Sequence, residues 1–183
     1  MFSMSVRRLC RALAVAVWAV PALAAGDEAI EVQRLMRQGD LQAALQRAST
    51  AASAQPTHAA ARFLQGVILT DLLRDAEALD VFERLTQEFP ALPEPYNNIA
   101  LLHARAGRWE QALTALQAAL RNDPTHRIAR ENLGDVHVQL ALQAWNTAAS
   151  GSVAGATLQR KLRLGRELAH GPLPAAVVGG TNR

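Results

Sequence analysis

The sequence has little material for covalent or redox chemistry. It has 183 residues and a single cysteine, Cys10, which lies in an N-terminal segment that we expect to be removed. A mature chain without a thiol has no internal disulfide, no redox couple and no thiolate metal site. Export would permit disulfides without requiring them, because stacked helices can build a core on their own.

Motifs of catalysis are also missing. The sequence has no HExxH pair, no glycine loop of the phosphate-binding type, no GxSxG elbow and no paired cysteines. We therefore predict no catalytic residue, no cofactor and no metal. One alternative stays open, in which His103 and His137, 34 residues apart, hold a metal with Asp135 or Asp71 as a further ligand.

Aromatic residues make up 4% of the chain, and they do not alternate with basic residues. Stacking platforms for single-stranded nucleic acid combine those two features, so we predict no nucleic-acid partner. The formal charge of +3 does not argue otherwise, because Arg7, Arg8 and Arg11 belong to the N-terminal segment. Without them the chain has 16 basic and 16 acidic residues.

The N-terminal segment has the layout of a secretory signal peptide. Its three arginines precede an uncharged apolar run over 12–20, and Pro21 to Ala24 ends with small residues. We expect residues 1–24 to be a signal peptide, cleaved before Ala25, and the protein to be periplasmic. The run is shorter than the roughly 20 residues of a membrane span, so we expect no stable span after cleavage, although retention as an anchor is the alternative.

Charge is distributed unevenly over the remaining residues. Residues 25–156 contain 11 basic and 15 acidic residues, whereas residues 157–183 contain five basic and one acidic residue. The C-terminal part could contact anionic envelope material or the acidic body of its own domain, or be a solvated helix end.

Three series of residues recur at intervals of 34: Pro56, Pro90 and Pro124; Ala44, Ala78 and Ala112; and Gly66, Ala100 and Gly134. A period of 34 is that of a helix-turn-helix repeat. We expect the small residues of the last two series, Gly134 included, to let two helices approach closely. Together with Asn132-Leu133-Gly134 and the series Ala112, Leu116, Ala119 and Pro124, these residues resemble the tetratricopeptide-repeat (TPR) family over about 125 residues. The stretches 90–100 and 131–136 further resemble short secreted TPR proteins of Gram-negative bacteria.

This resemblance implies an all-α fold, a right-handed superhelical solenoid of antiparallel helix pairs with a C-terminal capping helix. We assign repeats to 25–58, 59–92 and 93–126, a shortened fourth repeat to 127–150, the capping helix to 157–170 and a disordered tail to 171–183. Gly39 and Gly107 mark turns inside the first and third repeats, whereas Leu73 stands in the second. If Trp145 takes the role of Phe82, the fourth repeat has lost about five residues, enough to remove its turn, so we expect one long or kinked helix there that acts as an end cap.

By the same resemblance, the first helix of each repeat lines a concave groove that binds a protein or peptide. The residues expected to be exposed in this partner-binding groove are Phe63, Val67, Thr70, Asp71, Glu94, Asn97, Asn98, Leu101, Arg105, Glu131, Asn132 and Asp135. Four are carboxylates and one is a cation, a set that suits a peptide with apolar anchors and positive charge. Asn98 and Asn132 could instead bond neighbouring backbone.

The sequence thus predicts an exported adaptor or scaffold that binds an envelope protein in its groove. Two alternatives remain. The chain could be a structural subunit that self-associates through Trp145 and the helix over 157–170, or a metal-dependent enzyme using His103 and His137.

Overall fold

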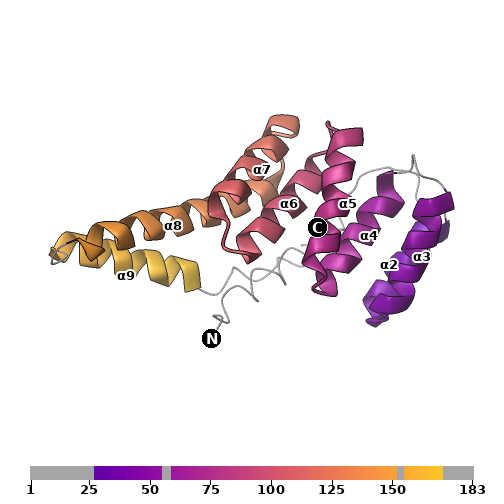
Figure 1. The fold of residues 1–183 in the computed structure, drawn as a ribbon, viewed down its shortest axis with the longest axis horizontal. Helices are drawn as coiled ribbons and strands as arrows, with labels where there is room; N and C mark the ends of the chain where they lie inside the picture. Colours follow the sequence, from indigo (N-terminus) through magenta and orange to yellow (C-terminus); the bar gives the residue numbers. More distant parts are fainter. Residues whose placement is uncertain (1–26, 55–58, 152–154, 171–183) are drawn as a thin grey trace, which may run out of the picture.

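A computed structural model describes residues 27–54, 59–151 and 155–170 of the chain. These residues form eight helices and no strand, as Figure 1 shows. In chain order the helices are α2 (Asp27–Gln38), α3 (Leu41–Ala54), α4 (Ala59–Asp71), α5 (Asp75–Glu88), α6 (Pro93–Arg105), α7 (Trp109–Asn122), α8 (Arg127–Ser150) and α9 (Ala156–His170). The expected signal peptide (1–24) and tail (171–183) lie outside the described residues.

Helices α2 to α7 form three antiparallel pairs, and each helix packs mainly on its neighbours in the chain (Figure 1). The small residues spaced by 34 lie at these contacts: Ala44, Ala78 and Ala112 are completely buried. Gly66 is needed for the same reason, because a Cβ there would lie 2.7 Å from the Phe82 ring. Close helix contact at these positions therefore depends on the absence of larger side chains.

The turn inside each pair has the same backbone geometry in all three repeats. Backbone N–H groups donate five residues back, from Asp40 to Leu35, Arg74 to Leu69 and Arg108 to His103, at 2.9–3.1 Å. The residue before each donor has a positive φ: 81° at Gly39, 61° at Leu73 and 73° at Gly107. Glycine adopts this region freely, whereas leucine does so at a steric cost.

Pro90 organises the connection between the second and third pairs. Its carbonyl oxygen accepts hydrogen bonds from Asn122 Nδ2 at 2.8 Å and from the Tyr96 hydroxyl at 3.3 Å. Pro93 opens α6, where its missing N–H costs nothing. The turn between repeats is thus held from both helices of the third pair.

Residues 127–150 form the single helix α8, whose 24 residues extend about 36 Å. Its first part packs on α7, and α9 packs on α8 beyond it, so that α8 and α9 project from the block of helix pairs (Figure 1). A Cβ on Gly165 of α9 would lie 2.8 Å from Leu142 and 3.0 Å from Trp145. The cap therefore covers the second part of α8.

Two expectations for the fourth repeat are wrong. Trp145 packs on Gly165 of α9, whereas Phe82 packs on Gly66 within its own repeat. Gly134 was expected to permit close helix contact, but nothing lies within 4 Å of a Cβ built there. Both differences have one cause: without a turn inside 127–150, α9 folds back on the second part of α8 and no second helix of the repeat lies over Gly134.

None of the described helices combines the length and the apolar character that crossing a membrane requires.

Candidate functional site

The twelve residues predicted to bind a partner lie on three helices. Four are on α4, five on α6 and three in the first part of α8. We call this set of twelve residues the first-helix face. Hydrogen bonds connect the helices that carry it, from α4 to α6 and from α6 to α8. The structure therefore brings residues far apart in the sequence to one side of the solenoid.

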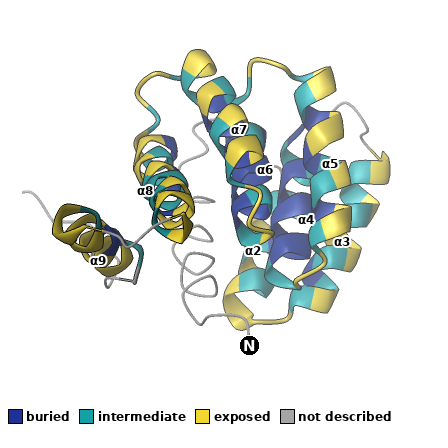
Figure 2. Ribbon diagram, turned by 60° about the vertical axis from the view of Figure 1, so that its left-hand side comes forward, coloured by how far each residue is buried: buried dark blue, intermediate teal, exposed yellow. Residues whose placement is uncertain are grey.

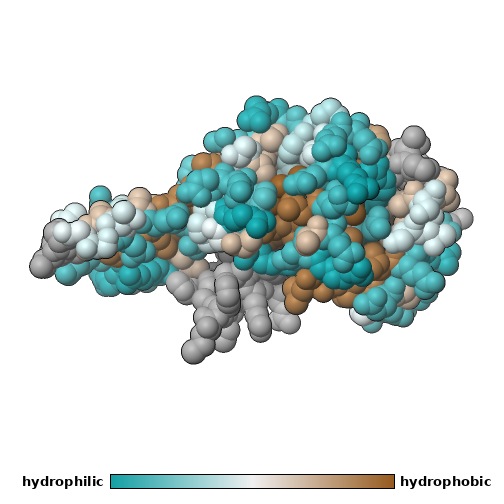
Figure 3. Space-filling view, in the orientation of Figure 1, coloured by the Kyte–Doolittle hydropathy of each residue, from teal (hydrophilic) through white to brown (hydrophobic). Residues whose placement is uncertain are grey.

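The expectation that all twelve are exposed is wrong for six of them. Phe63, Val67, Thr70, Asn97, Asn98 and Leu101 are only 1–8% exposed. Figure 2 shows the buried residues concentrated on α4 and α6, and Figure 3 shows apolar surface over the centre of the molecule between more polar margins. The Phe63 and Phe82 rings pack with centroids 5.7 Å apart. These apolar side chains form core.

The asparagines of the face are used in internal hydrogen bonds. Asn132 Nδ2 on α8 donates to Asn97 Oδ1 on α6 at 2.9 Å, and Asn97 is 1% exposed. Asn98 Nδ2 donates to the Glu94 backbone oxygen at 2.9 Å, one turn earlier in α6. A buried amide needs such partners, since an unsatisfied one is costly. Asn98 and Asn132 thus both have internal partners. The partner of Asn98 is a backbone oxygen, and that of Asn132 is the Asn97 side chain.

Arg105, the cation of the face, connects two repeats. Its Nη1 atom forms an ion pair with Asp75 at the start of α5 and donates to the Thr70 backbone oxygen at 3.3 Å. Its side chain is 13% exposed. In the sequence, the signal for this role is the interval of 35 residues between Thr70 and Arg105, which places them on successive first helices.

The four carboxylates of the face have few cations to balance them. Asp71 and Asp135 are half-buried, and burial raises the pKa of each carboxyl above its ordinary 3.8. The charge of Arg105 opposes this rise in the pKa of Asp71, whereas Glu131 adds to the rise for Asp135. Glu131 itself lies 3.7 Å from the exposed Arg127, a pair of little strength. The face therefore has an excess of negative charge.

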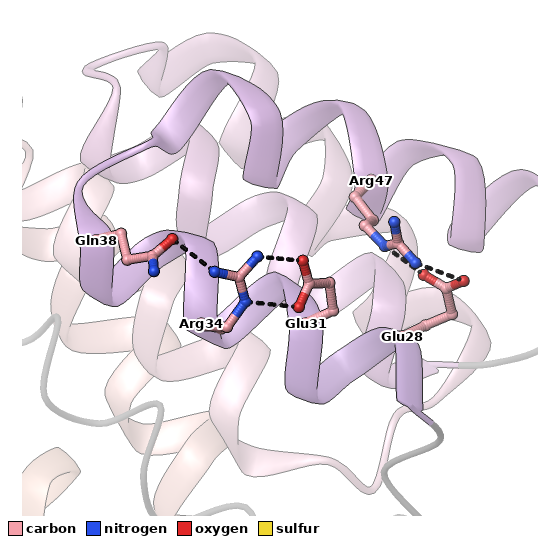
Figure 4. Close-up of polar contacts among 5 residues, drawn as sticks. All are labelled: Glu28, Glu31, Arg34, Gln38 and Arg47. Atoms are coloured by element: carbon pink, nitrogen blue, oxygen red, sulfur yellow. Dashed lines mark hydrogen bonds and ion pairs between the residues drawn. The ribbon is translucent and has the colours of Figure 1, made fainter.

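A second polar region, on α2 and α3, was not singled out from the sequence (Figure 4). Arg34 bonds Glu31 and Gln38 within α2, and Arg47 of α3 bonds Glu28 of α2. A shallow hollow of about 400 Å³ lies beside the Arg47–Glu28 pair. It is lined by Glu28, Leu35, Ala43, Gln46, Arg47 and Thr50. Of these exposed pairs, only Arg47–Glu28 connects the two helices, whereas the Arg34 bonds stay within α2.

The two-histidine metal site finds no support in the described residues. No group of three histidine, cysteine, aspartate or glutamate side chains there is arranged to hold a metal ion. His103 Nδ1 accepts a hydrogen bond from Arg108 Nε at 3.0 Å, and burial, aided by Arg108, lowers the pKa of His103. His137 is exposed on α8. His103 is therefore half-buried and bonded to the turn of its own repeat.

Comparison with protein-family models gives one match, to the tetratricopeptide repeat, over residues 31–93 and 97–152. No curated protein sequence matches the chain.

Many solved structures resemble the chain, and three of them illustrate the likeness. The first TPR domain of human RPAP3 has a TM-score of 0.59 and 15% identity, over 62% of this chain and 90% of that one. A tetratricopeptide repeat protein from Parabacteroides merdae has a TM-score of 0.57 and 17% identity, over 91% and 74%. A MamA RS-1 double mutant has a TM-score of 0.55 and 17% identity, over 94% and 100%. These likenesses confirm the all-α solenoid with its terminal helix.

Proposed function

Because the chain belongs to the tetratricopeptide-repeat family, we propose that it is an exported protein-binding module whose first-helix face holds a basic segment of a cell-envelope protein. TPR folds are in general interaction modules without catalysis, and binding to a protein is the coarse function that the family carries. We propose, in addition, that the partner binds on the first-helix face, that its contacting segment is basic and that binding takes place in the cell envelope.

The charge balance of the first-helix face carries the proposal. Asp71, Glu94, Glu131 and Asp135 lie on α4, α6 and α8, whereas the cation of the face, Arg105, is paired with Asp75. A basic segment laid across these helices would supply the missing positive charge. Half-buried carboxylates gain most from such a partner, because their charge is poorly solvated without it.

The apolar residues of the first-helix face are buried, so they offer little surface for contact with a partner. Phe63, Val67 and Leu101 are buried in the structure, so they shape the face from beneath and are not its anchors. Contact then depends on the carboxylates at the surface. Electrostatic recognition of this kind gives fast and salt-sensitive association.

The compartment rests on the N-terminal segment of the sequence. Three arginines, an apolar run and small residues before Ala25 have the order of a signal peptide. A cell-envelope protein is therefore the partner that the chain would meet after export.

In-cell photocrosslinking tests this function. We would place a photoreactive residue at Glu94, Glu131 or Asp135, and identify captured proteins by mass spectrometry. Matched positions are Glu110 and Gln117, which are exposed on the second helix α7. We expect one recurrent envelope protein with a basic contact segment from the first set and not from the second.

Equal capture from both sets, or no capture from the first, would contradict binding at the first-helix face. Export is measured separately, by fractionation and N-terminal sequencing, and a mature N-terminus at Ala25 is the expected result.

A further inference from the structure

The outer side of α9 presents apolar surface that the described residues leave exposed. Leu162 and Gly165 are buried against α8, whereas Leu164 is 43% and Leu168 is 72% exposed. Residues four apart lie on one side of a helix, so these two leucines form a continuous stripe. Among the described residues only Ile30 and Leu73 are other large hydrophobic side chains with such exposure.

Positive charge surrounds this stripe. Helix α9 has four basic residues, Arg160, Lys161, Arg163 and Arg166, and one acidic residue, Glu167, for a net charge of +3. At 100° per residue, Arg160 and Lys161 flank the leucines on either side. Lys161 Nζ also lies 5.9 Å from the centroid of the Trp145 ring of α8. The outer side of α9 is therefore both apolar and basic.

The rest of the molecule has the opposite charge. Residues 27–151 contain 11 basic and 15 acidic residues, a net charge of −4. Within them, the first-helix face has four carboxylates and one cation, which is already paired. The two complementary surfaces thus belong to the same sequence, and no other partner needs to be assumed.

The shape of the molecule keeps these surfaces apart within one chain. Helix α9 packs on α8, and the pair points away from α4 and α6 (Figure 1). A contact between the outer side of α9 and the part of the first-helix face on α4 and α6 therefore has to form between two copies.

We propose that the outer side of α9, through Leu164, Leu168, Arg160 and Lys161, docks on the first-helix face of a second copy. The inference rests on the proposed function in one respect, that the first-helix face is a binding surface. Because the two surfaces differ, the contact is head-to-tail, so in a dimer one copy keeps a free first-helix face and the other keeps a free α9. A basic partner segment and α9 then compete for the same face.

Mixing two variants tests the head-to-tail contact on the protein purified as the cell processes it. The α9 variant carries Leu164→Ser, Leu168→Ser and Arg160→Glu, and the face variant carries Glu94→Gln, Glu131→Gln and Asp135→Asn. Sedimentation velocity over a concentration series should show self-association of the unchanged protein and at least a tenfold weaker association of each variant alone. An equimolar mixture should recover a 1:1 dimer, because one intact α9 meets one intact face.

Matched controls are Ile30→Ser, which removes an exposed hydrophobic residue at the other end, and Glu83→Gln with Glu110→Gln on second helices. Both should associate like the unchanged protein. Circular dichroism of every variant checks that it is folded.

Three outcomes would overturn the inference. They are a monomeric unchanged protein, an α9 variant that still associates, and a mixture that stays monomeric. Binding of α9 to vesicles with anionic lipid, without self-association, would assign the surface to a membrane instead. The proposed function is decided by a different result: capture of an envelope protein from Glu131 would uphold it even if the unchanged protein is monomeric. Loss of that capture while self-association persists would overturn the proposed function alone.

Discussion

Helices α6 and α8 occupy equivalent positions in successive repeats and differ sharply in burial. Eight of the 13 residues of α6 are buried, against three of the 24 of α8. Helix α6 has packed neighbours on several sides, including α5 and α7, whereas the later part of α8 has α9. The same starting pattern therefore produces core in one repeat. In the next it produces the projecting hairpin that α8 and α9 form.

The comparison isolates the turn as the cause. Gly107 lets the chain reverse after α6, so that α7 folds back and buries it. No glycine, proline or polar turn interrupts 141–148, and the chain continues as one helix. Loss of a few residues thus changes which surfaces remain for other molecules.

The largest expected effect separates the two cores. Phe82→Ala removes a completely buried ring beside Gly66 and Phe63, and should lower the free energy of unfolding by about 3–5 kcal/mol. Trp145→Ala in the hairpin should lower it by about 1–2 kcal/mol, because that ring is only half-buried. Urea unfolding followed by circular dichroism measures both. Equal losses would mean that the hairpin is as integral to the core as the repeats.

Overpacking the hairpin should give the next effect. Gly165→Leu places atoms where Leu142 and Trp145 already lie, at a cost of about 1–3 kcal/mol. Gly134→Leu is the matched change, since its Cβ would meet nothing within 4 Å. Hydrogen exchange should become faster in α9 and in the later part of α8 for the first variant only. Faster exchange throughout α4–α7 would show that the two regions unfold together.

Exchanging residues at the turns tests the strained leucine. Leu73→Gly should stabilise the protein by about 0.5–1 kcal/mol. The left-handed conformation costs leucine roughly 1–2 kcal/mol, and part of the gain is lost because glycine gives up more backbone conformational entropy on folding. Gly107→Leu, the equivalent change in the third repeat, should destabilise by a similar amount, as its Cβ would meet no atom within 4 Å and only the backbone resists. Thermal unfolding of the pair measures the two shifts, and shifts of the same sign would refute the argument.

The smallest effect concerns the half-buried carboxylates. A raised pKa means that the folded state of Asp135 holds its proton more tightly than the unfolded chain, so stability is lost as pH rises above the ordinary 3.8. Asp135→Asn should therefore stabilise the protein at pH 7 by a few tenths of a kcal/mol, discounted for partial exposure, and this gain should vanish below about pH 4.

Much of the helical plan was readable from the sequence, and the reasons are local. The prolines lie at turns, and the alanines and Gly66 lie at contacts between neighbouring helices. These residues recur every 34 positions because the same turns and contacts recur. Gly39 and Gly107 likewise mark turns whose backbone only glycine adopts without cost. The missing turn within 127–150 was visible as an uninterrupted helical pattern.

The surface of the site was harder to read, because it depends on contacts between repeats. A repeat pattern says that Asn97 and Asn132 lie on first helices, but not that they bond each other. It also places Phe63 and Val67 on the inner side without telling how closely the next helix approaches. Burial of these residues follows from the stacking of whole helices, which no single interval in the sequence encodes.

The unbroken course of α8 also sets an angular relation between the ends of the molecule. Each residue of a helix turns it by about 100°, so one residue inserted between Val136 and Leu142 would rotate α9 by that angle about the axis of α8. The leucines of α9 would then point in another direction relative to α4 and α6. An insertion or deletion in α8 preserves the orientation of α9 relative to α4 and α6 only when its length is close to a whole number of helical turns. The length of α8 therefore sets the direction in which α9 faces.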